Sequence, residues 1–322
     1  MSAAKVTLGR RLFFETRLSS TGRYSCATCH RPELAFTDGR AQAEGATGDR
    51  VRRGAMTLTN VAYNIAFTWA NSNVHSLEAQ MRQPLFSEHP IEMGLKGDGE
   101  SWVRILSADS SYRAEFAAAF PDDPSTLNIE HVIKAIASFE RTLISGRSPF
   151  DRYVYDDDRA AISETAKRGM ELFYSERLGC AQCHSGLNFS GPLVYVAHEK
   201  ETPSFANNGL YNGRGGAYPR GDQGLIEVTH RAQDMGKFRV PTLRNVALTA
   251  PYMHDGSLPT LDAVLDHYAH GGRGNPRQDP RIRAVALSES EHAELIAFLQ
   301  SLTDRDFVEN PQFSAPKPRL SR

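Results

Sequence analysis

Two copies of one short motif, Cys-x-x-Cys-His, contain all the cysteines of the chain. The motif residues are Cys26, Cys29, His30, Cys180, Cys183 and His184. Two thiols three positions apart can add to the two vinyl groups of one haem, and the histidine that follows then binds the iron from one face. A zinc knuckle would need the two cysteine pairs to converge, and a redox dithiol has no need of the histidine. The sequence therefore predicts two covalently bound haem c groups, with His30 and His184 as iron ligands.

A longer repeat precedes each motif. Gly9-Arg-Arg-Leu-Phe-Phe-Glu-Thr-Arg-Leu18 and Gly169-Met-Glu-Leu-Phe-Tyr-Ser-Glu-Arg-Leu178 share Gly, Leu, Phe, an aromatic residue, Arg and Leu in register. The apolar spacing predicts a helix that packs on a haem and leads into the motif, with chance similarity of two amphipathic helices as the alternative. We therefore expect two homologous haem domains, an N-terminal one over 1–150 and a C-terminal one over 151–322 that carries a C-terminal extension.

The elements that must position these motifs are mainly helices. Periodic apolar residues predict helices over Ala4–Glu15, Ser76–Arg82, Ser101–Ala108, Tyr112–Phe120, Ile129–Ser145, Ala160–Ser175, Thr260–Tyr268 and Ser288–Leu302. Ser288-x-x-Glu291 is a capping box. The stretch 186–241 is rich in Gly, Asn and Pro and predicts long loops, and strand patterns are few. The expected fold class is mainly α, with two cytochrome c-like domains, long loops and little strand.

Composition and hydropathy exclude several classes of partner. The net charge of −1 gives no basic surface for nucleic acid, and no apolar run of about 18 residues is present to span a membrane. The first residues do not form a signal-peptide pattern. Because covalent haem attachment implies an oxidising, extracytoplasmic compartment, we expect a periplasmic protein whose signal segment is absent from this sequence.

Further motifs follow one another in the order of a known family. They are Leu8-Gly-Arg-Arg-Leu-Phe13, Leu77-Glu-Ala-Gln80, Glu92-Met-Gly94, Phe238-Arg-Val-Pro-Thr-Leu-Arg-Asn245 and Ala250-Pro-Tyr-Met-His-Asp-Gly256. With the two haem motifs, they make the whole chain resemble the bacterial di-haem cytochrome c peroxidases, and within them the MauG-like branch. The resemblance implies that hydrogen peroxide reacts at the haem of His30, in a distal pocket formed by Gln80, Pro84 and Glu92.

The first iron is expected to be open to peroxide. Relatives that rest with a distal histidine draw it from the segment before a conserved asparagine, but no histidine lies between Arg31 and Val74. A carboxyl group with a raised pKa can take a proton from one peroxide oxygen and return it to the other. Glu92 is the candidate, with Gln80 as a positioning partner. The loop 84–92 is about two residues longer than in the family, so Glu88 or His89 is the alternative.

The second iron is expected to be closed by a tyrosine. The position that supplies a methionine ligand in many relatives is Tyr268 here, as in MauG. A phenolate is a hard anionic donor that stabilises high-valent iron. The alternative is a core aromatic at Tyr268 with His267 or His270 as ligand. Met253 and His254, in the turn motif, are expected to shape the haem environment.

The resemblance implies two further features between the domains. Trp69 would lie between the haems and carry oxidising equivalents, with a core tryptophan as the alternative. A calcium ion would be held by the Asn60 side chain and the carbonyl oxygens of Arg239 and Pro241, a role that competes with Asn60 as a helix cap or turn residue. Leu178 stands where MauG carries the surface tryptophan that passes oxidising equivalents to its partner, so a different exit is expected.

These features lead to one function and two alternatives. The first is an oxidoreductase that uses hydrogen peroxide to form a high-valent, bis-Fe(IV)-type di-haem state, which oxidises a tryptophan or similar residue of a partner protein at a distance. Within the MauG-like branch, the chain resembles the MauG homologue associated with methanobactin operons, which modifies a tryptophan of a partner. The second is a cytochrome c peroxidase that only removes peroxide, with a small cytochrome or copper protein as electron donor. The third is a non-catalytic electron carrier with both irons six-coordinate.

Overall fold

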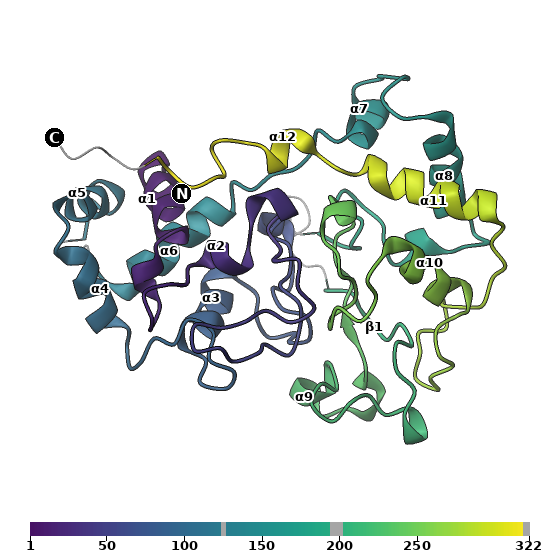
Figure 1. Ribbon diagram of the computed structural model, residues 1–322, viewed down its shortest axis with the longest axis horizontal. Helices are drawn as coiled ribbons and strands as arrows, with labels where there is room; N and C mark the ends of the chain where they lie inside the picture. The colour runs from purple at the N-terminus through teal and green to yellow at the C-terminus, as the bar shows by residue number, and fades with distance from the viewer. Residues whose placement is uncertain (124–126, 194–201, 318–322) are drawn as a thin grey trace.

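The computed structural model describes residues 1–123, 127–193 and 202–317. These residues form two lobes of helices joined by long loops, which confirms the mainly α fold class with little strand (Figure 1). The helices are α1 (Ala3–Phe13), α2 (Cys26–Cys29), α3 (Leu77–Phe86), α4 (Glu100–Ser107), α5 (Ser110–Ala119), α6 (Ile129–Glu140), α7 (Pro149–Tyr155), α8 (Glu164–Tyr174), α9 (Ile226–Thr229), α10 (Leu261–Ala269), α11 (Glu289–Ser301) and α12 (Arg305–Val308). The strands β1 (Phe205–Ala206) and β2 (Phe238–Arg239) pair antiparallel. Within the described residues, every helix is too short or too polar to cross a membrane.

The repeated glycine upstream of each haem motif is a point of helix crossing. A Cβ atom on Gly9 of α1 would lie 1.8 Å from the carbonyl oxygen of Ala135 on α6. A Cβ atom on Gly169 of α8 would lie 1.8 Å from the carbonyl oxygen of Glu294 on α11. Since no side chain fits in either place, glycine lets both helix pairs approach closely. The sequence repeat is therefore also a structural repeat, with one crossed pair of helices in each lobe.

The first lobe is completed by the far end of the chain. Its buried core extends from α1 to Leu143 and also contains Phe307, Val308 and Phe313. The ring of Phe307 lies 5.6 Å from that of Phe36, measured between centroids. Figure 1 shows the chain running from α11 through α12 and back to α1. A second core, from Phe150 to Leu302, forms the other lobe. The first core thus combines residues up to Leu143 with residues of the C-terminal segment, and the second core begins at Phe150; the division into domains 1–150 and 151–322 stays a prediction.

Two segments with the pattern Thr-Leu-x-Asn-Val-Ala join the lobes. Asn60 and Asn245 hold the same place in them, each with a left-handed backbone at the start of a 3₁₀ helix. The amide of Asn60 accepts from the Ser145 N–H (2.7 Å) and donates to the Ser145 carbonyl (2.8 Å). The amide oxygen of Asn245 accepts from the Asp304 N–H (2.7 Å), and the Asp304 carboxylate accepts from the Ser145 hydroxyl (3.0 Å). These buried bonds fix the connection between the lobes on both sides.

Candidate haem sites

The first motif lies in a short helix whose geometry prepares His30 for a metal. Ser25 caps α2, and its side chain and that of Thr28 form a reciprocal capping box. The next residue, His30, is half-buried, and its Nδ1 donates to the carbonyl oxygen of Phe36 (2.9 Å). Because that bond fixes the proton on Nδ1, the lone pair of Nε2 is left for a ligand bond. Burial lowers the pKa of His30, which favours the neutral ring that binds iron.

The second motif repeats this arrangement. The Nδ1 atom of His184 donates to the carbonyl oxygen of Phe189 (2.8 Å), and burial again lowers the pKa of the ring. Phe189 and Phe36 both have a positive φ, so the same backbone turn presents the acceptor in each lobe. None of the four motif cysteines forms a disulfide bond, so each thiol is available to bind a haem. Two free thiols and one neutral imidazole at each motif are the donor set that a covalently bound haem requires.

The residues predicted for the first distal pocket come from α3 and the loop after it. Gln80 and Pro84 lie on α3, and the Met93 N–H donates to the Pro84 carbonyl (2.9 Å), which folds the loop back onto the helix. Glu92 lies in this returning segment, and the carbonyl of the next residue, Met93, accepts the N–H of Ser20 (2.8 Å), shortly before the first motif. The structure therefore brings Glu92 and the first haem motif together.

The longer loop does not put a different acid in this place. Glu88 and His89 are both exposed, whereas Glu92 is largely buried and burial raises the pKa of its carboxyl. The nearest histidine after the motif, His75, is exposed, and its Nδ1 bonds to the carbonyl oxygen of Ile65 (3.3 Å). Glu92 is thus the ionisable side chain of this loop with the environment that the proton-transfer role needs.

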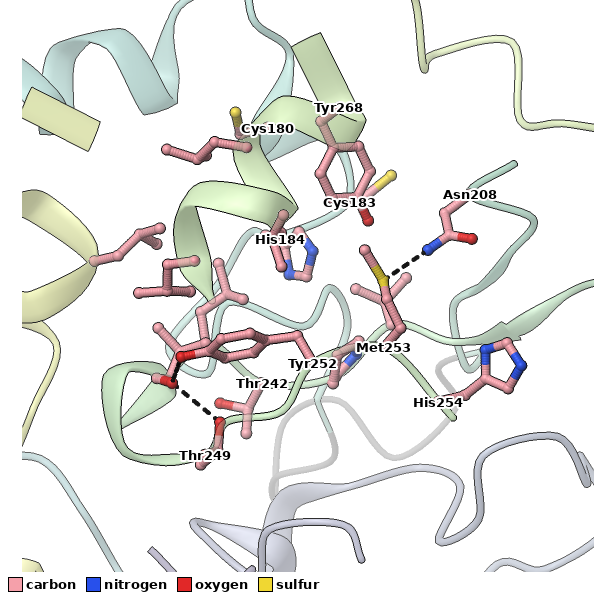
Figure 2. A pocket seen from close by; sticks show the side chains of 18 of the residues that line it. Cys180, Cys183, His184, Asn208, Thr242, Thr249, Tyr252, Met253, His254 and Tyr268 are labelled. Carbon is pink, nitrogen blue, oxygen red and sulfur yellow. Dashed lines mark hydrogen bonds between the residues drawn. The ribbon is translucent and has the colours of Figure 1, made fainter. Parts of the chain in front are cut away.

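A cavity of about 290 Å³ adjoins the second motif and contains the predicted tyrosine ligand. Tyr268, near the end of α10, is half-buried and lines this cavity, and desolvation raises the pKa of its phenol to about 12. Figure 2 shows the Tyr268 hydroxyl and the Met253 thioether pointing toward one another beside the His184 ring. The Asn208 side chain interacts with both, donating to the Met253 sulfur (3.2 Å). Nothing in the sequence pattern indicated Asn208, because it lies in an irregular loop about 60 residues earlier.

The two histidines that compete with Tyr268 have other partners. The Nε2 atom of His267 donates to the carbonyl oxygen of Asn208 (2.9 Å), so its proton is on the nitrogen that a metal would need. His270 is exposed, and its Nδ1 bonds to the Asp266 carbonyl on its own helix (2.7 Å). Tyr268 therefore has the better geometry for the ligand position, and Met253 lies beside it, in the surroundings of the predicted haem where the turn motif was expected to be.

The same cavity reaches the first lobe. Trp69 lines it, donates from Nε1 to the Gly54 carbonyl (2.9 Å), and accepts the Arg239 N–H at its own carbonyl (2.7 Å). The guanidinium of Arg239 also lines the cavity, and its Nε has no hydrogen-bond partner among the described residues. Burial lowers the pKa of Arg239 to about 10. A buried cation without a carboxylate partner fits a haem propionate, so the residues present fit the predicted cofactor.

The side chain of Asn60, one of the predicted calcium ligands, already bonds to other groups of the protein. Both polar atoms of the Asn60 side chain already bond to the Ser145 backbone, and its Nδ2 also donates to the Asn188 amide oxygen (2.9 Å). This is the bonding of a structural turn residue, which was the competing interpretation. The ligand set of Asn60 with the carbonyls of Arg239 and Pro241 stays a prediction, and no step proposed below uses calcium.

Comparisons with known proteins agree with the motifs. The profile of the family described as di-haem cytochrome c peroxidase matches residues 3–159. The methylamine utilization protein MauG of Methylorubrum extorquens is 38% identical, over 94% of this chain and 79% of its own length. Cytochrome-c peroxidase IdrP1 of Denitromonas iodatirespirans is 35% identical, over 94% of this chain and 82% of its own. A crystal structure of a MauG-like protein associated with microbial copper homeostasis superposes with a TM-score of 0.94 at 40% identity, covering 98% of this chain and 94% of that one.

Proposed function

This chain belongs to the di-haem cytochrome c peroxidase and MauG family of haem oxidoreductases, and from that membership we propose that it uses hydrogen peroxide to oxidise a residue of a partner protein. The finer choice within the family depends on what faces His184. Tyr268 is the observation that carries the proposal, because it lines the His184 cavity at the predicted ligand position. A phenolate ligand favours storage of oxidising equivalents over rapid electron entry.

The chain's own residues divide the work between the lobes. Glu92 takes a proton from one peroxide oxygen and delivers it to the other, and Gln80 orients the peroxide. Trp69, beside the cavity that both lobes line, carries charge from one lobe to the other. Bound haem supplies the iron that reacts with peroxide and retains the two oxidising equivalents. The partner's oxidised residue, a tryptophan or similar side chain, is then reached at a distance. We place this reaction in the periplasm, where covalent haem attachment is completed.

A second candidate function is favoured by Met253. Its thioether lies beside Tyr268 in the same cavity, and a methionine ligand would raise the potential of the second haem. The haem would then accept electrons from a small cytochrome or copper protein, and the enzyme would only remove peroxide. The two functions therefore differ in which of two neighbouring side chains binds the iron.

Substituting each side chain separately distinguishes these functions. Under the proposal, Tyr268→Phe changes the low-spin absorption and electron paramagnetic resonance signals of the haem-loaded protein, and the matched Met253→Leu variant leaves them in place. Peroxide added without reductant gives a long-lived oxidised species in the unmodified protein and a weakened one in Tyr268→Phe. A low-spin spectrum that Met253→Leu alters and Tyr268→Phe does not would support the peroxide-removing function instead.

A further inference from the structure

A cluster of aromatic side chains leads from Trp69 away from the haem cavity. Trp69 and Tyr211 both pack against a small core that contains Tyr218 and Phe238. The rings of Tyr211 and Tyr218 lie 5.5 Å apart between centroids, at an angle of 74°. Tyr218 and Phe238 are almost fully buried, whereas Tyr211 is partly exposed. The cluster therefore connects the residue between the haems to the surface of the second lobe.

A line of hydrogen bonds follows the same direction and crosses between the lobes. The Trp69 Nε1–H donates to the carbonyl oxygen of Gly54 (2.9 Å), and the N–H of Gly54 donates to the carbonyl oxygen of His254 (2.8 Å). The next residue in the chain is Asp255, and its carboxylate accepts a hydrogen bond from the Tyr211 hydroxyl. Only two hydrogen bonds and a short stretch of backbone thus separate the indole of Trp69 from the carboxylate that binds Tyr211.

The two tyrosines of the cluster differ in what accepts their proton. Tyr211 donates to the carboxylate of Asp255, a group that can take up the phenol proton. Tyr218 donates to the neutral amide oxygen of Asn207 (2.8 Å). A phenol that loses an electron must also lose its proton, which a positioned base accepts far better than an amide. The guanidinium of Arg273 lies 5.9 Å from the Tyr211 ring and further disfavours a ring that keeps a positive charge.

We propose that Tyr211, with Asp255 as its base, is the relay residue through which oxidising equivalents pass from Trp69 to the partner protein. This relay rests on the function proposed above and supplies the exit that Leu178 cannot provide. In each transfer, one-electron-oxidised Trp69 takes an electron from Tyr211, and the phenol proton moves to the Asp255 carboxylate. A partner residue then gives an electron to the neutral Tyr211 radical, and the proton returns from Asp255. Two such transfers account for the two electrons that one hydrogen peroxide accepts on conversion to water.

Three variants of the haem-loaded protein test the relay. Each is mixed with hydrogen peroxide without reductant, frozen rapidly, and examined by electron paramagnetic resonance, with ring-deuterated tyrosine to identify tyrosyl signals. Tyr211→Phe is expected to abolish the tyrosyl signal. Asp255→Asn keeps the phenol but removes the base, and is expected to lower the signal about tenfold, the order of effect of losing a hydrogen bond to a charged group. Tyr218→Phe, the matched control in the same cluster, is expected to retain it.

The optical change of the haems in the same samples distinguishes failure of the relay from failure of the proposed function. A haem oxidation that forms normally in all variants, together with a tyrosyl signal that survives in Tyr211→Phe, would overturn the relay and leave the proposed function intact. Peroxide that produces no oxidised haem species even in the unmodified protein would overturn the proposed function, and the relay with it. A second readout does not depend on signal assignment: a nitroso spin trap should form an adduct that peptide mass spectrometry locates at Tyr211.

Discussion

Glu140, the last residue of α6, is a buried carboxyl whose ionisation should weaken the fold. Its side chain is almost fully buried, and its Oε2 atom has no hydrogen-bond partner among the described residues. Burial raises the pKa of Glu140 from an ordinary 4.5 to about 8, with Arg141 acting in the opposite direction and Glu78 adding to the rise. The folded protein therefore keeps this proton at neutral pH, whereas the unfolded chain releases it.

The expected effect of Glu140→Gln follows from this difference. A carboxyl whose folded-state pKa is raised costs nothing below pH 4.5, where both states are protonated, and its cost grows as the pH rises to about 8. At about 1.4 kcal/mol per pH unit, the cost is roughly 3 kcal/mol at pH 7 and roughly 4 kcal/mol at pH 8. Glutamine does not ionise, so the variant avoids this cost. The difference in free energy of unfolding between the variant and the unmodified protein should therefore be larger at pH 7 and pH 8 than near pH 4.5, by these amounts.

The measurement is urea denaturation of both haem-loaded proteins at a series of pH values from about 5 to 8. The free-energy difference between them should grow steadily with pH. The control is Glu15→Gln: burial opposes ionisation of Glu15, but hydrogen bonds from Arg17 and Tyr112 outweigh it and lower its pKa, so this variant should lose stability that is present above the ordinary pKa and vanishes in acid. A Glu140→Gln difference that stays constant across the range would refute the argument, because it would mean that Glu140 is paired or titrates normally.

Three further substitutions test other contacts. Glu92→Gln should slow the reaction with peroxide by about 10²–10⁴-fold. It should also remove the acid limb of the pH–rate profile, which in the unmodified protein lies above pH 4.5 because burial raises the pKa of Glu92. Stopped-flow absorbance measures both effects, and an unchanged rate would exclude Glu92 as the base. Asp151→Asn leaves the fully buried Arg244 without its ion partner (2.8 Å) and should cost about 3–5 kcal/mol in the free energy of unfolding, with a loss below about 1 kcal/mol counting against a buried pair. Gly169→Ala puts a Cβ against the Glu294 carbonyl and should cost at least about 1–3 kcal/mol in the same assay, unless α8 and α11 separate easily.

Most helices could be predicted because local signals mark them, and the differences arise where distant residues intervene. The capping box at Ser288 and Glu291 is confirmed at the start of α11. The helix predicted to continue to Ser145 ends instead at Glu140, because the backbone groups of Ser145 bond to the side chain of Asn60, 85 positions away. No local pattern contains that information.

One helix was missed although its signal is present. Ser148 caps α7, and Asp151 returns the hydrogen bond to its N–H, a capping box with proline at the first helical position. The helices expected from the periodic apolar residues leave this stretch out, and the predicted division between domains falls inside it. The Thr-Leu-x-Asn-Val-Ala repeat was likewise visible in the sequence, and it marks the two asparagines that join the lobes.

The residues of the candidate site also fall into those that local sequence predicts and those that depend on distant partners. The haem motifs predict their own chemistry because all of its atoms lie within a few residues of each other in the chain. The partners of Tyr268 and Tyr211, by contrast, are Asn208 and Asp255, which lie 60 and 44 positions away. Only the folded chain brings such pairs together, so the environment of each redox side chain had to come from the structure.

The return of the C-terminal segment to the first lobe has a consequence for how the protein is made. During synthesis, the ribosome releases the residues of the first haem motif early, but Phe307, Val308 and Phe313, which complete the same core, come only after the entire second lobe. The order in which the two lobes are synthesised is thus not the order in which their cores are completed. The lobe whose synthesis begins first is therefore completed last, after the residues of the second core have been made.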